Sequence, residues 1–168
     1  MRRLFIRKIK RPILKFVMQF LSKNMSKNVN VNGFSKVNSK TTFGENIHFN
    51  GMVVKGHGNV HFGNNFHSGK RCKIITDFHN YEGNSIPYDR TIISKDVKVG
   101  DNVWFGDEVL VLGGVTIEEG AIIQARSVVT SNIGYCEIAG GHPAKSFKIR
   151  DIEHYEELRK LKRFIIFS

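Results

Sequence analysis

Apolar residues recur at every sixth position through the centre of this chain. A helix would need them every three to four positions, and a half-buried strand would need strict alternation. A six-residue period instead predicts a solenoid, in which each hexad forms a short strand and a corner, three hexads close a triangular coil, and stacked coils bury a continuous core. The bulky series is Ile93, Val99, Phe105, Val111, Ile117, Ile123 and Val129, and the smaller series, four positions later, is Val97, Val103, Val109, Val115, Ala121, Ser127 and Ile133.

The third position after each bulky residue is rich in glycine and asparagine, which tolerate a positive φ. We therefore expect a left-handed backbone conformation to recur at one corner of each coil. Glu108 and Arg126 depart from this composition. The residues that do have asparagine or glycine at this third position are Asn46, Asn65, Asn102, Gly114, Gly120 and Asn132.

The period also extends upstream, with two interruptions. It slips by one residue near Gly56–Asn59, and a longer break runs from Asp77 to about Arg90. Departures from a solenoid repeat form loops on one face, and such loops usually hold the functional residues. The upstream positions are Val31, Val37, Phe43, Phe49, Phe62, Ser68 and Ile74, with companions at Val29, Thr41, Ile47, Val53, Phe66 and Cys72.

The net charge of +11 is concentrated at one end of the chain. Residues 1–23 contain eight bases and no acid, whereas the remaining 145 residues contain 18 bases and 15 acids. Bases and apolar residues alternate around Pro12, which favours an amphipathic helical arm that lies on an anionic membrane surface, caps the solenoid end, or does both. The arm is too charged to span a membrane. We expect no nucleic-acid binding, because bases barely exceed acids outside the arm.

These patterns divide the chain into three parts. Residues 1–24 form the basic amphipathic arm, 25–148 the β-solenoid with a loop at 77–90, and 149–168 a C-terminal helix whose early acids and late bases complement the helix dipole. Cys72 occupies a core position, and neither it nor Cys136 suggests a disulfide or a zinc site. The expected location is cytoplasmic, either free or peripheral at the inner membrane face.

Four segments in this order resemble the C-terminal half of the hexapeptide-repeat acyltransferases: Asp101–Gly106, Gly113–Ile117, Ser127–Thr130 and Ala139–Lys145. This resemblance implies a left-handed parallel β-helix, a homotrimer and acetyl-coenzyme A as acyl donor. The segment His79–Asp89 further resembles the active-site loop of the branch that acetylates sugars of bacterial surface polysaccharides, whose acceptors are often lipid-linked.

By this resemblance His79 matches the catalytic histidine. A sugar hydroxyl must lose its proton as it attacks the thioester, and histidine is suited to accept that proton. Because the thioester is already activated, the reaction requires neither a metal nor a covalent enzyme intermediate, and we predict direct transfer in a ternary complex. Asp77, Glu82, Asp89 or a backbone carbonyl could fix the tautomer of His79, and His61, one nominal coil earlier, could stack beneath it. The expected acceptor-binding residues are Tyr81, Asn84, Tyr88 and Asp89, although Tyr88 could equally brace the loop.

The resemblance also assigns the coenzyme A site, which the family places in the cleft between neighbouring subunits. Arg126 stands where the family commonly has glycine, so it could contact a phosphate or obstruct this cleft. Residues 133–136 replace a turn that usually contains proline. The matching positions are Trp104, Asp107, Ala125, Thr130, Ser131, Lys145 and Lys148.

Of the remaining histidines, His48, His67 and His154 are expected at the surface, and His142 in a turn.

Within the same class of enzyme, the alternative function is an amino-sugar N-acetyltransferase or an antibiotic-inactivating acetyltransferase. A non-catalytic β-helix that serves as a scaffold or membrane-surface module is the alternative from another class, and it predicts no coenzyme A binding.

Overall fold

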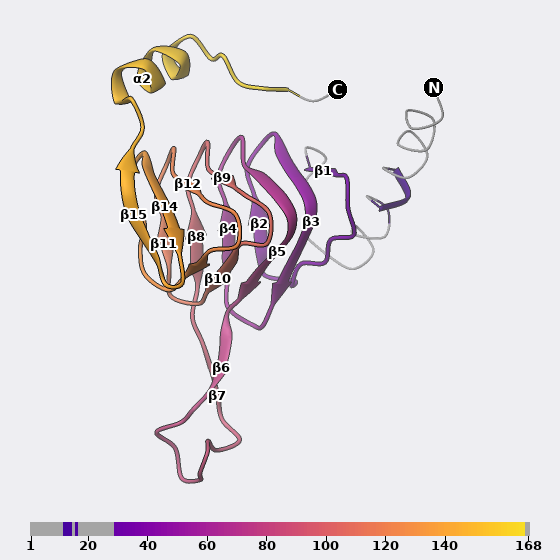
Figure 1. The fold of residues 1–168 in the computed structure, drawn as a ribbon. Coiled ribbons are helices and arrows are strands. Elements are labelled where there is room, and N and C mark those ends of the chain that lie inside the picture. The colour runs from indigo at the N-terminus through magenta and orange to yellow at the C-terminus, as the bar shows by residue number, and fades with distance from the viewer. Residues whose placement is uncertain (1–11, 15, 17–28, 167–168) are drawn as a thin grey trace.

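The computed structural model describes residues 12–14, 16 and 29–166, and these build a parallel β-solenoid followed by a short helix (Figure 1). The predicted left-handed parallel β-helix is confirmed. Strands β1 to β15 are followed by one helix, α2 (Ile152–Lys160). The strands are β1 (Val29–Val31), β2 (Thr41–Phe43), β3 (Ile47–Lys55), β4 (Val60–Phe62), β5 (His67–Ile75), β6 (Asp77–His79), β7 (Ile92–Ser94), β8 (Val97–Val99), β9 (Trp104–Phe105), β10 (Leu110–Leu112), β11 (Thr116–Ile117), β12 (Ile122–Ile123), β13 (Val128–Val129), β14 (Glu137–Gly141) and β15 (Ala144–Ile149).

The strands line three faces of a prism. Face 1 holds β1, the first part of β3 and of β5, then β9, β12 and β14. Face 2 holds the second part of β3 and of β5, then β10 and β13. Face 3 holds β2, β4, β8 and β11. We name the bends corner 1–2, corner 2–3 and corner 3–1, after the faces that they join.

The pairing register gives the length of a coil. On face 1 Asn30 pairs with His48 at a spacing of 18 residues, which equals three hexads. On face 3 Thr42 pairs with His61 at a spacing of 19 residues, so the one-residue slip before β4 is confirmed. From β5 to β9 the interval rises to 37 residues, because β6 and β7 leave the solenoid as an antiparallel hairpin.

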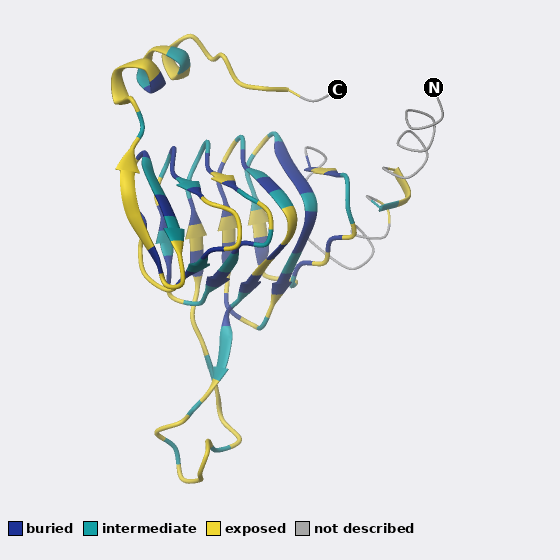
Figure 2. Ribbon diagram, in the orientation of Figure 1, coloured by how far each residue is buried: buried dark blue, intermediate teal, exposed yellow. Residues whose placement is uncertain are grey.

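The core is the interior of the prism (Figure 2). Phe49, Phe62, Phe66 and Phe105 are fully buried and pack ring against ring, with centroid separations of 4.7 to 5.9 Å. The bulky and small series of the repeat are buried from Val97 to Ile133.

Two expected core positions are wrong, and a third, Phe43, is only partly buried against the core. Ile93 lies on β7 of the hairpin, outside the core, because the chain does not rejoin the solenoid until β8. Val53 is only partly buried, whereas Met52 and Val54 are buried in its place. A register shift between His48 and Asn50 changes the phase of this strand.

Positive φ recurs at the corners, as predicted. Corner 3–1 uses Asn46, Asn65, Asn102 and Gly120, with φ between 55° and 74°. Corner 1–2 adopts the same conformation at Arg71, Glu108 and Arg126, with φ between 56° and 61°, although long side chains occupy it. The two apparent exceptions in composition are therefore not exceptions in backbone conformation, because the coil geometry imposes the bend on whatever residue stands there. Asn132 does not share it.

Helix α2 follows the last coil and lies over one end of corner 3–1. Its N-cap is Asp151, whose carboxylate accepts a hydrogen bond from the backbone N–H of His154 (3.0 Å). Beyond α2 the chain runs back along the solenoid (Figure 1), and the carbonyl of Ile165 accepts a hydrogen bond from Asn46 Nδ2 (3.0 Å). Among the described residues of this tail, Leu161, Phe164, Ile165 and Ile166 are exposed in the single chain.

Most of the N-terminal arm lies outside the described residues. Of the few that are described, Leu14 packs partly buried against the core, whereas Ile13 and Phe16 are exposed. The choice between cap and membrane contact remains a prediction. Within the described ranges, we find no helix of the length and apolarity needed to cross a membrane.

Candidate functional site

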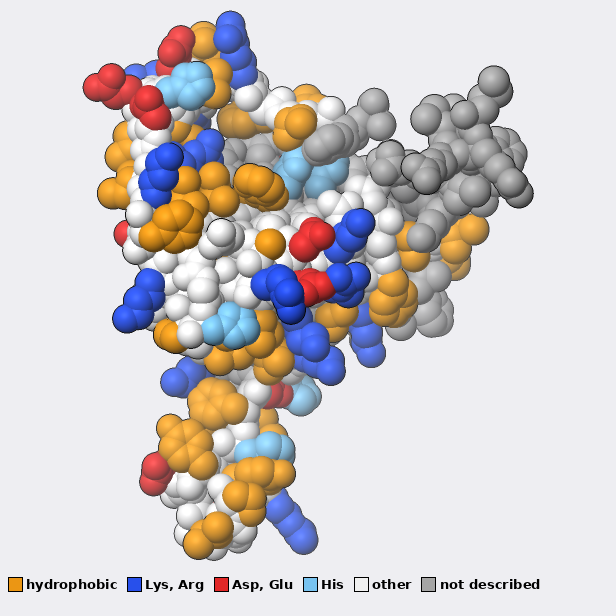
Figure 3. Space-filling model, in the orientation of Figure 1, with side chains coloured by type: hydrophobic (Ala, Val, Ile, Leu, Met, Phe, Trp, Pro, Cys, Tyr) orange, Lys and Arg blue, Asp and Glu red, His pale blue; other side chains and the backbone are white. Residues whose placement is uncertain are grey.

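The long interruption of the repeat is a hairpin that projects from corner 2–3. Strands β6 and β7 pair antiparallel, from Asp77 with Ser94 to His79 with Ile92, and the connection between them extends away from the solenoid (Figure 1). In the space-filling view most of its visible surface is hydrophobic (Figure 3). A projecting apolar hairpin indicates a surface that meets another molecule.

The hairpin is fastened to the preceding coil at its base. The Asp77 carboxylate accepts hydrogen bonds from the His57 backbone N–H (2.8 Å), the Ser94 hydroxyl (2.7 Å) and the Thr76 hydroxyl (3.2 Å), and it lies 2.5 Å from His57 Nδ1. Desolvation, the largest single contribution, opposes ionisation of Asp77, but the hydrogen bonds together lower its pKa well below the ordinary value. Asp77 is therefore ionised at neutral pH and fixes where β6 leaves the solenoid.

His79 occupies the end of β6, exposed to solvent. Its ring stacks on Tyr88, with the centroids 3.9 Å apart and the planes 12° from parallel. Tyr88 comes from the far side of the hairpin connection, so the stack joins the two arms of the loop. An exposed imidazole with one covered face can still accept a proton at a ring nitrogen.

The carboxylates expected to orient His79 have other partners. Asp77 bonds to His57 and Ser94, as described above. Asp89 accepts from the Thr91 hydroxyl (2.5 Å) and the Thr91 backbone N–H (2.8 Å), and these bonds lower the pKa of Asp89. Within the described part of the chain, no hydrogen bond joins either group, or Glu82, to the His79 ring. The Tyr88 stack is thus the contact that orients His79 in this structure.

The four predicted acceptor residues all lie on the hairpin. Tyr81, Asn84 and Tyr88 are exposed. Asp89 accepts a hydrogen bond from the Asn84 backbone N–H (3.3 Å) in addition to its bonds with Thr91, so its carboxylate shapes the loop. Both roles weighed for Tyr88 remain open, since a ring that stacks on His79 also has an exposed edge. The assignment of these residues to acceptor binding stays a prediction.

The predicted cofactor residues form two groups in space. Trp104, Asp107 and Ala125 line a groove of about 470 Å³ where face 1 meets corner 1–2. Phe147 on β15 forms part of its wall, and Lys145 and Lys148 are exposed on the same strand. Asp107 also accepts a hydrogen bond from the Lys70 backbone N–H (2.7 Å), so its carboxylate braces the corner.

Thr130 and Ser131 belong to the second group. They are exposed beyond the end of β13, at corner 2–3, the corner from which the hairpin projects. His79 therefore shares a corner with Thr130 and Ser131, while Trp104 lies across the prism on face 1. One copy of the chain does not bring all the predicted site residues together.

Arg126 does not line the groove at corner 1–2. Its side chain is 82 % exposed and its Nε lies 3.5 Å from Glu108 Oε2, while Arg71 pairs with the other oxygen of Glu108. The three side chains form a ladder of charges along the corner. In this structure Arg126 neither obstructs the groove nor contacts its floor.

Several histidines differ from expectation. His48 is buried and stacks on His67, which is partly buried, with centroids 4.5 Å apart; burial lowers the pKa of His67. The expectation that both lie at the surface is wrong, because strand packing on face 1 covers them. His154 is exposed and His142 lies in the β14–β15 turn, as expected. His61 bonds to Thr42 Oγ1 (3.0 Å) on face 3, so its proposed position beneath His79 is wrong.

The hydrogen-bonded pair of His57 and Asp77, which we call the His57–Asp77 clamp, was not predicted from the sequence. Its signal was present, because the two positions are 20 residues apart and residues about one coil apart come into register. The same arithmetic misplaced His61, since His79 leaves the solenoid with the hairpin and no longer follows the coil register. Phe147 gave no such signal, because β15 pairs antiparallel and lies outside the repeat.

Comparison with known proteins shows which proteins this chain is similar to in sequence and in structure. Residues 96–131 match the model of the bacterial transferase hexapeptide (six repeats). A chloramphenicol acetyltransferase of Agrobacterium fabrum is 33% identical over 76 residues, which is 45% of this chain and 34% of that protein. A maltose O-acetyltransferase structure from Clostridium difficile 630 is 26% identical, with a TM-score of 0.70 over 80% of this chain and 73% of that one. A hexapeptide-repeat acetyltransferase from Vibrio cholerae, solved with acetyl-coenzyme A, is 22% identical with a TM-score of 0.68, over 80% and 75% of the two chains.

The extent of these matches differs between sequence and structure. The chain spans between 25% and 34% of the length of the first three curated relatives, and about three quarters of the two solved structures. The segment that matches the family model begins beside β8, where the solenoid resumes after the hairpin. The repeat, the coil geometry and these matches agree that the chain is a β-solenoid whose residues 96–131 are similar to the bacterial transferase hexapeptide (six repeats).

Proposed function

We propose that this protein is an acetyl-coenzyme A-dependent O-acetyltransferase that modifies a sugar hydroxyl during synthesis of a bacterial surface polysaccharide. The observation that carries the proposal is the exposed His79 on a hairpin that interrupts a hexapeptide solenoid. Relatives and structural neighbours named as acetyltransferases, one of them solved with acetyl-coenzyme A and one named for maltose, support it.

In the proposed reaction the acceptor hydroxyl gives its proton to a ring nitrogen of His79 as its oxygen attacks the thioester carbonyl. The tetrahedral intermediate collapses, the carbon–sulfur bond breaks, and the departing thiolate takes the proton from the imidazolium. The products are the acetyl ester and free coenzyme A. The stack on Tyr88 keeps the His79 ring in one orientation during both proton transfers.

The groove at corner 1–2 is the proposed site of the pantetheine arm, with Lys145 and Lys148 near the coenzyme A phosphates. Since His79 and Trp104 lie on different sides of the prism, we propose that two copies of the chain share each active site. The hairpin and corner 2–3 of one copy then meet face 1 of the next, in a closed homotrimer.

The first test follows thiol release from acetyl-coenzyme A with purified protein and a panel of sugars, for wild type and His79→Ala. Acceptor-dependent turnover that falls by about two to four orders of magnitude in the variant is expected for a general base. Turnover that the substitution leaves unchanged would remove His79 from the mechanism and favour an amine acceptor. Absence of both turnover and coenzyme A binding would favour the non-catalytic scaffold.

The second test addresses the shared site. His79→Ala and Trp104→Ala proteins, each impaired alone, are unfolded together, refolded together and assayed. If each site takes its hairpin and its groove from different copies, random mixing restores about a quarter of the sites. A mixture no more active than the separate variants would show that both residues act within one copy.

A further inference from the structure

A second groove lies on face 1, on the opposite side of Trp104 from the proposed cofactor groove. Its volume is about 560 Å³, within the range of small-molecule sites. The floor comes from outward-facing side chains of neighbouring coils, where His67, Trp104 and Ile122 stand in register. Helix α2 and the tail behind it supply the other wall, through Leu158, Phe164 and Ile165. We call it the α2 groove.

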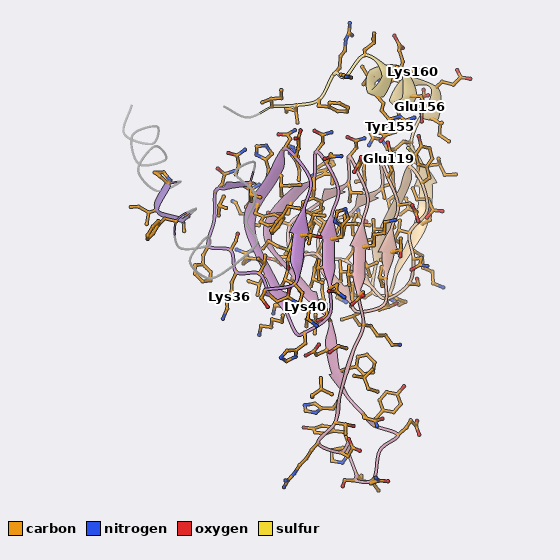
Figure 4. The ribbon with its side chains drawn as sticks, turned by 180° about the vertical axis from the view of Figure 1, so that it is seen from behind. Lys36, Lys40, Glu119, Tyr155, Glu156 and Lys160 are labelled. Carbon is orange, nitrogen blue, oxygen red and sulfur yellow. The ribbon has the colours of Figure 1, made fainter. Side chains whose placement is uncertain are left out.

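The wall formed by α2 is anchored to the solenoid. The Tyr155 hydroxyl accepts a hydrogen bond from Asn102 Nδ2 (2.8 Å) and donates one to Glu119 Oε1 (2.9 Å), and Figure 4 shows Tyr155 and Glu119 together where α2 meets the corner. Arg150 donates to the Gly120 carbonyl (3.1 Å) and covers the Tyr155 ring, 4.7 Å from its centroid. The groove is therefore formed within a single copy of the chain.

The α2 groove combines apolar and cationic surface. Arg150, Arg159 and Arg163 line it, and among the described residues that line it none is acidic. Arg159 pairs with Glu156 and Glu119, which lie outside the lining. Arg163 is exposed and forms no ion pair with any residue that the structure describes. In the space-filling view basic and hydrophobic side chains lie side by side where α2 meets the solenoid (Figure 3).

A ligand that fits these walls has an anionic group beside an apolar or planar one. Guanidinium groups bind phosphate oxygens in pairs of hydrogen bonds, and Trp104 and Phe164 offer rings for stacking or apolar contact. Trp104 belongs to both grooves, so a ligand here lies next to the proposed cofactor and not in its place.

We propose that the α2 groove binds the diphosphate end of the acceptor, a sugar carried on an isoprenyl or nucleoside diphosphate. This inference rests on the proposed function, because it assigns the groove to the second substrate. The diphosphate contacts Arg163 and its neighbours, and the carrier group lies on the apolar wall. The sugar then extends past Trp104 toward the hairpin of the adjoining copy.

Trp104 is the only tryptophan of the chain, so its fluorescence reports both grooves in the full-length protein. Three probes are titrated, with and without saturating coenzyme A: geranyl diphosphate, uridine diphosphate and geraniol. We expect one diphosphate to bind equally well in the presence of coenzyme A, and geraniol to bind far more weakly. The tighter of the two diphosphates identifies the source of the carrier.

Two substitutions separate the grooves. Arg163→Gln is expected to weaken the diphosphate about tenfold, as for the loss of a charge-assisted hydrogen bond, and to leave coenzyme A affinity within about twofold. Arg163→Lys should restore part of the diphosphate affinity. Lys148→Gln is the matched control, since it removes an exposed cation from the cofactor side and should weaken coenzyme A alone.

The other outcomes overturn the inference. Competition between the diphosphate and coenzyme A would make the α2 groove part of the cofactor site. Equal binding of geraniol, or a diphosphate affinity unchanged in Arg163→Gln, would remove the anionic subsite. Failure of coenzyme A to bind while the diphosphate binds would contradict the proposed function and leave the groove assignment standing.

Discussion

Asn65 allows the left-handed corner to be tested apart from its hydrogen bonds. Its φ is 55°, its Oδ1 accepts from Asn46 Nδ2 (2.9 Å), and its Nδ2 donates to Asn102 Oδ1 (2.9 Å). The neighbouring Asn64 also makes two side-chain hydrogen bonds, from the Glu45 backbone N–H (2.9 Å) and to Asp101 Oδ2 (3.1 Å), but its φ is not positive. Replacement of each residue by alanine and by glycine gives four matched variants.

The magnitudes follow from these contacts. Either substitution at Asn65 removes two hydrogen bonds, with a cost of about 2 kcal/mol at about 1 kcal/mol each. Alanine at a positive φ adds roughly 1–2 kcal/mol of strain, whereas glycine adds about 0.5–1 kcal/mol of unfolded-state entropy. We therefore expect the glycine variant to be more stable than the alanine variant at Asn65. At Asn64 the order reverses, and alanine should be more stable by about 0.4–1 kcal/mol.

The assay is thermal and urea unfolding of the four variants, at one protein concentration. A difference of about 1 kcal/mol corresponds to roughly 2–4 °C in the melting temperature of a protein of this size. The sign of the alanine–glycine difference at the two positions decides the result. The same sign at both would refute the claim that the coil geometry imposes a strained conformation at corner 3–1.

Three further predictions concern the hairpin, the helix and the core. Asp77→Ala should lower kcat about 10- to 100-fold with little change in the KM for acetyl-coenzyme A, since it frees the base of the hairpin. Asp101→Ala loses similar hydrogen bonds at another corner and should leave kcat unchanged. An equal loss of kcat in both variants would contradict the role of the His57–Asp77 clamp. Tyr155→Phe should cost about 1–2 kcal/mol and increase amide exchange in α2, whereas unchanged exchange would mean that other contacts hold the helix. Burial raises the pKa of the Cys72 thiol from 9.0 to about 11, so native protein should resist thiol labelling at pH 8. The contribution of this thiol to the free energy of unfolding should be full below pH 9 and should disappear as the pH rises through 11. Rapid labelling of native protein at Cys72 would disprove its burial.

The solenoid could be predicted from the sequence because a hexad is a complete local unit. Val99, Phe105 and Val111 each repeat the same strand and bend, so one residue pattern determines both the face and the interior position. The prediction was wrong at Val53, where an irregular register shifts the phase while residue types remain apolar. Composition alone does not reveal such a shift, since Met52 and Val54 satisfy the core equally well.

The site was predictable only in part, for a geometric reason. His79 stands out because it lies in the segment that interrupts a strict repeat. The structure places it on the hairpin that this segment forms. The stack of His79 on Tyr88 depends on the path of the loop, which no periodicity encodes. The α2 groove depends on how a tail packs against neighbouring coils, and it joins Arg163 to Trp104, whose strand β9 lies two coils before β14.

The hairpin leaves the hydrogen-bond pattern of the solenoid unchanged, as the spacing of contacts shows. Before the hairpin, corner partners lie one coil apart, as Asn46 and Asn65 do at 19 residues. Across it, Asn65 bonds to Asn102 at 37 residues with the same distance of 2.9 Å, so the insertion leaves the ladder intact. The core therefore does not constrain the length or sequence of the loop, and the His57–Asp77 clamp transmits the position of the rigid coils to His79. In such an arrangement the loop can be altered without loss of the solenoid fold, so under the proposed function the acceptor side of the site can change independently of the donor groove.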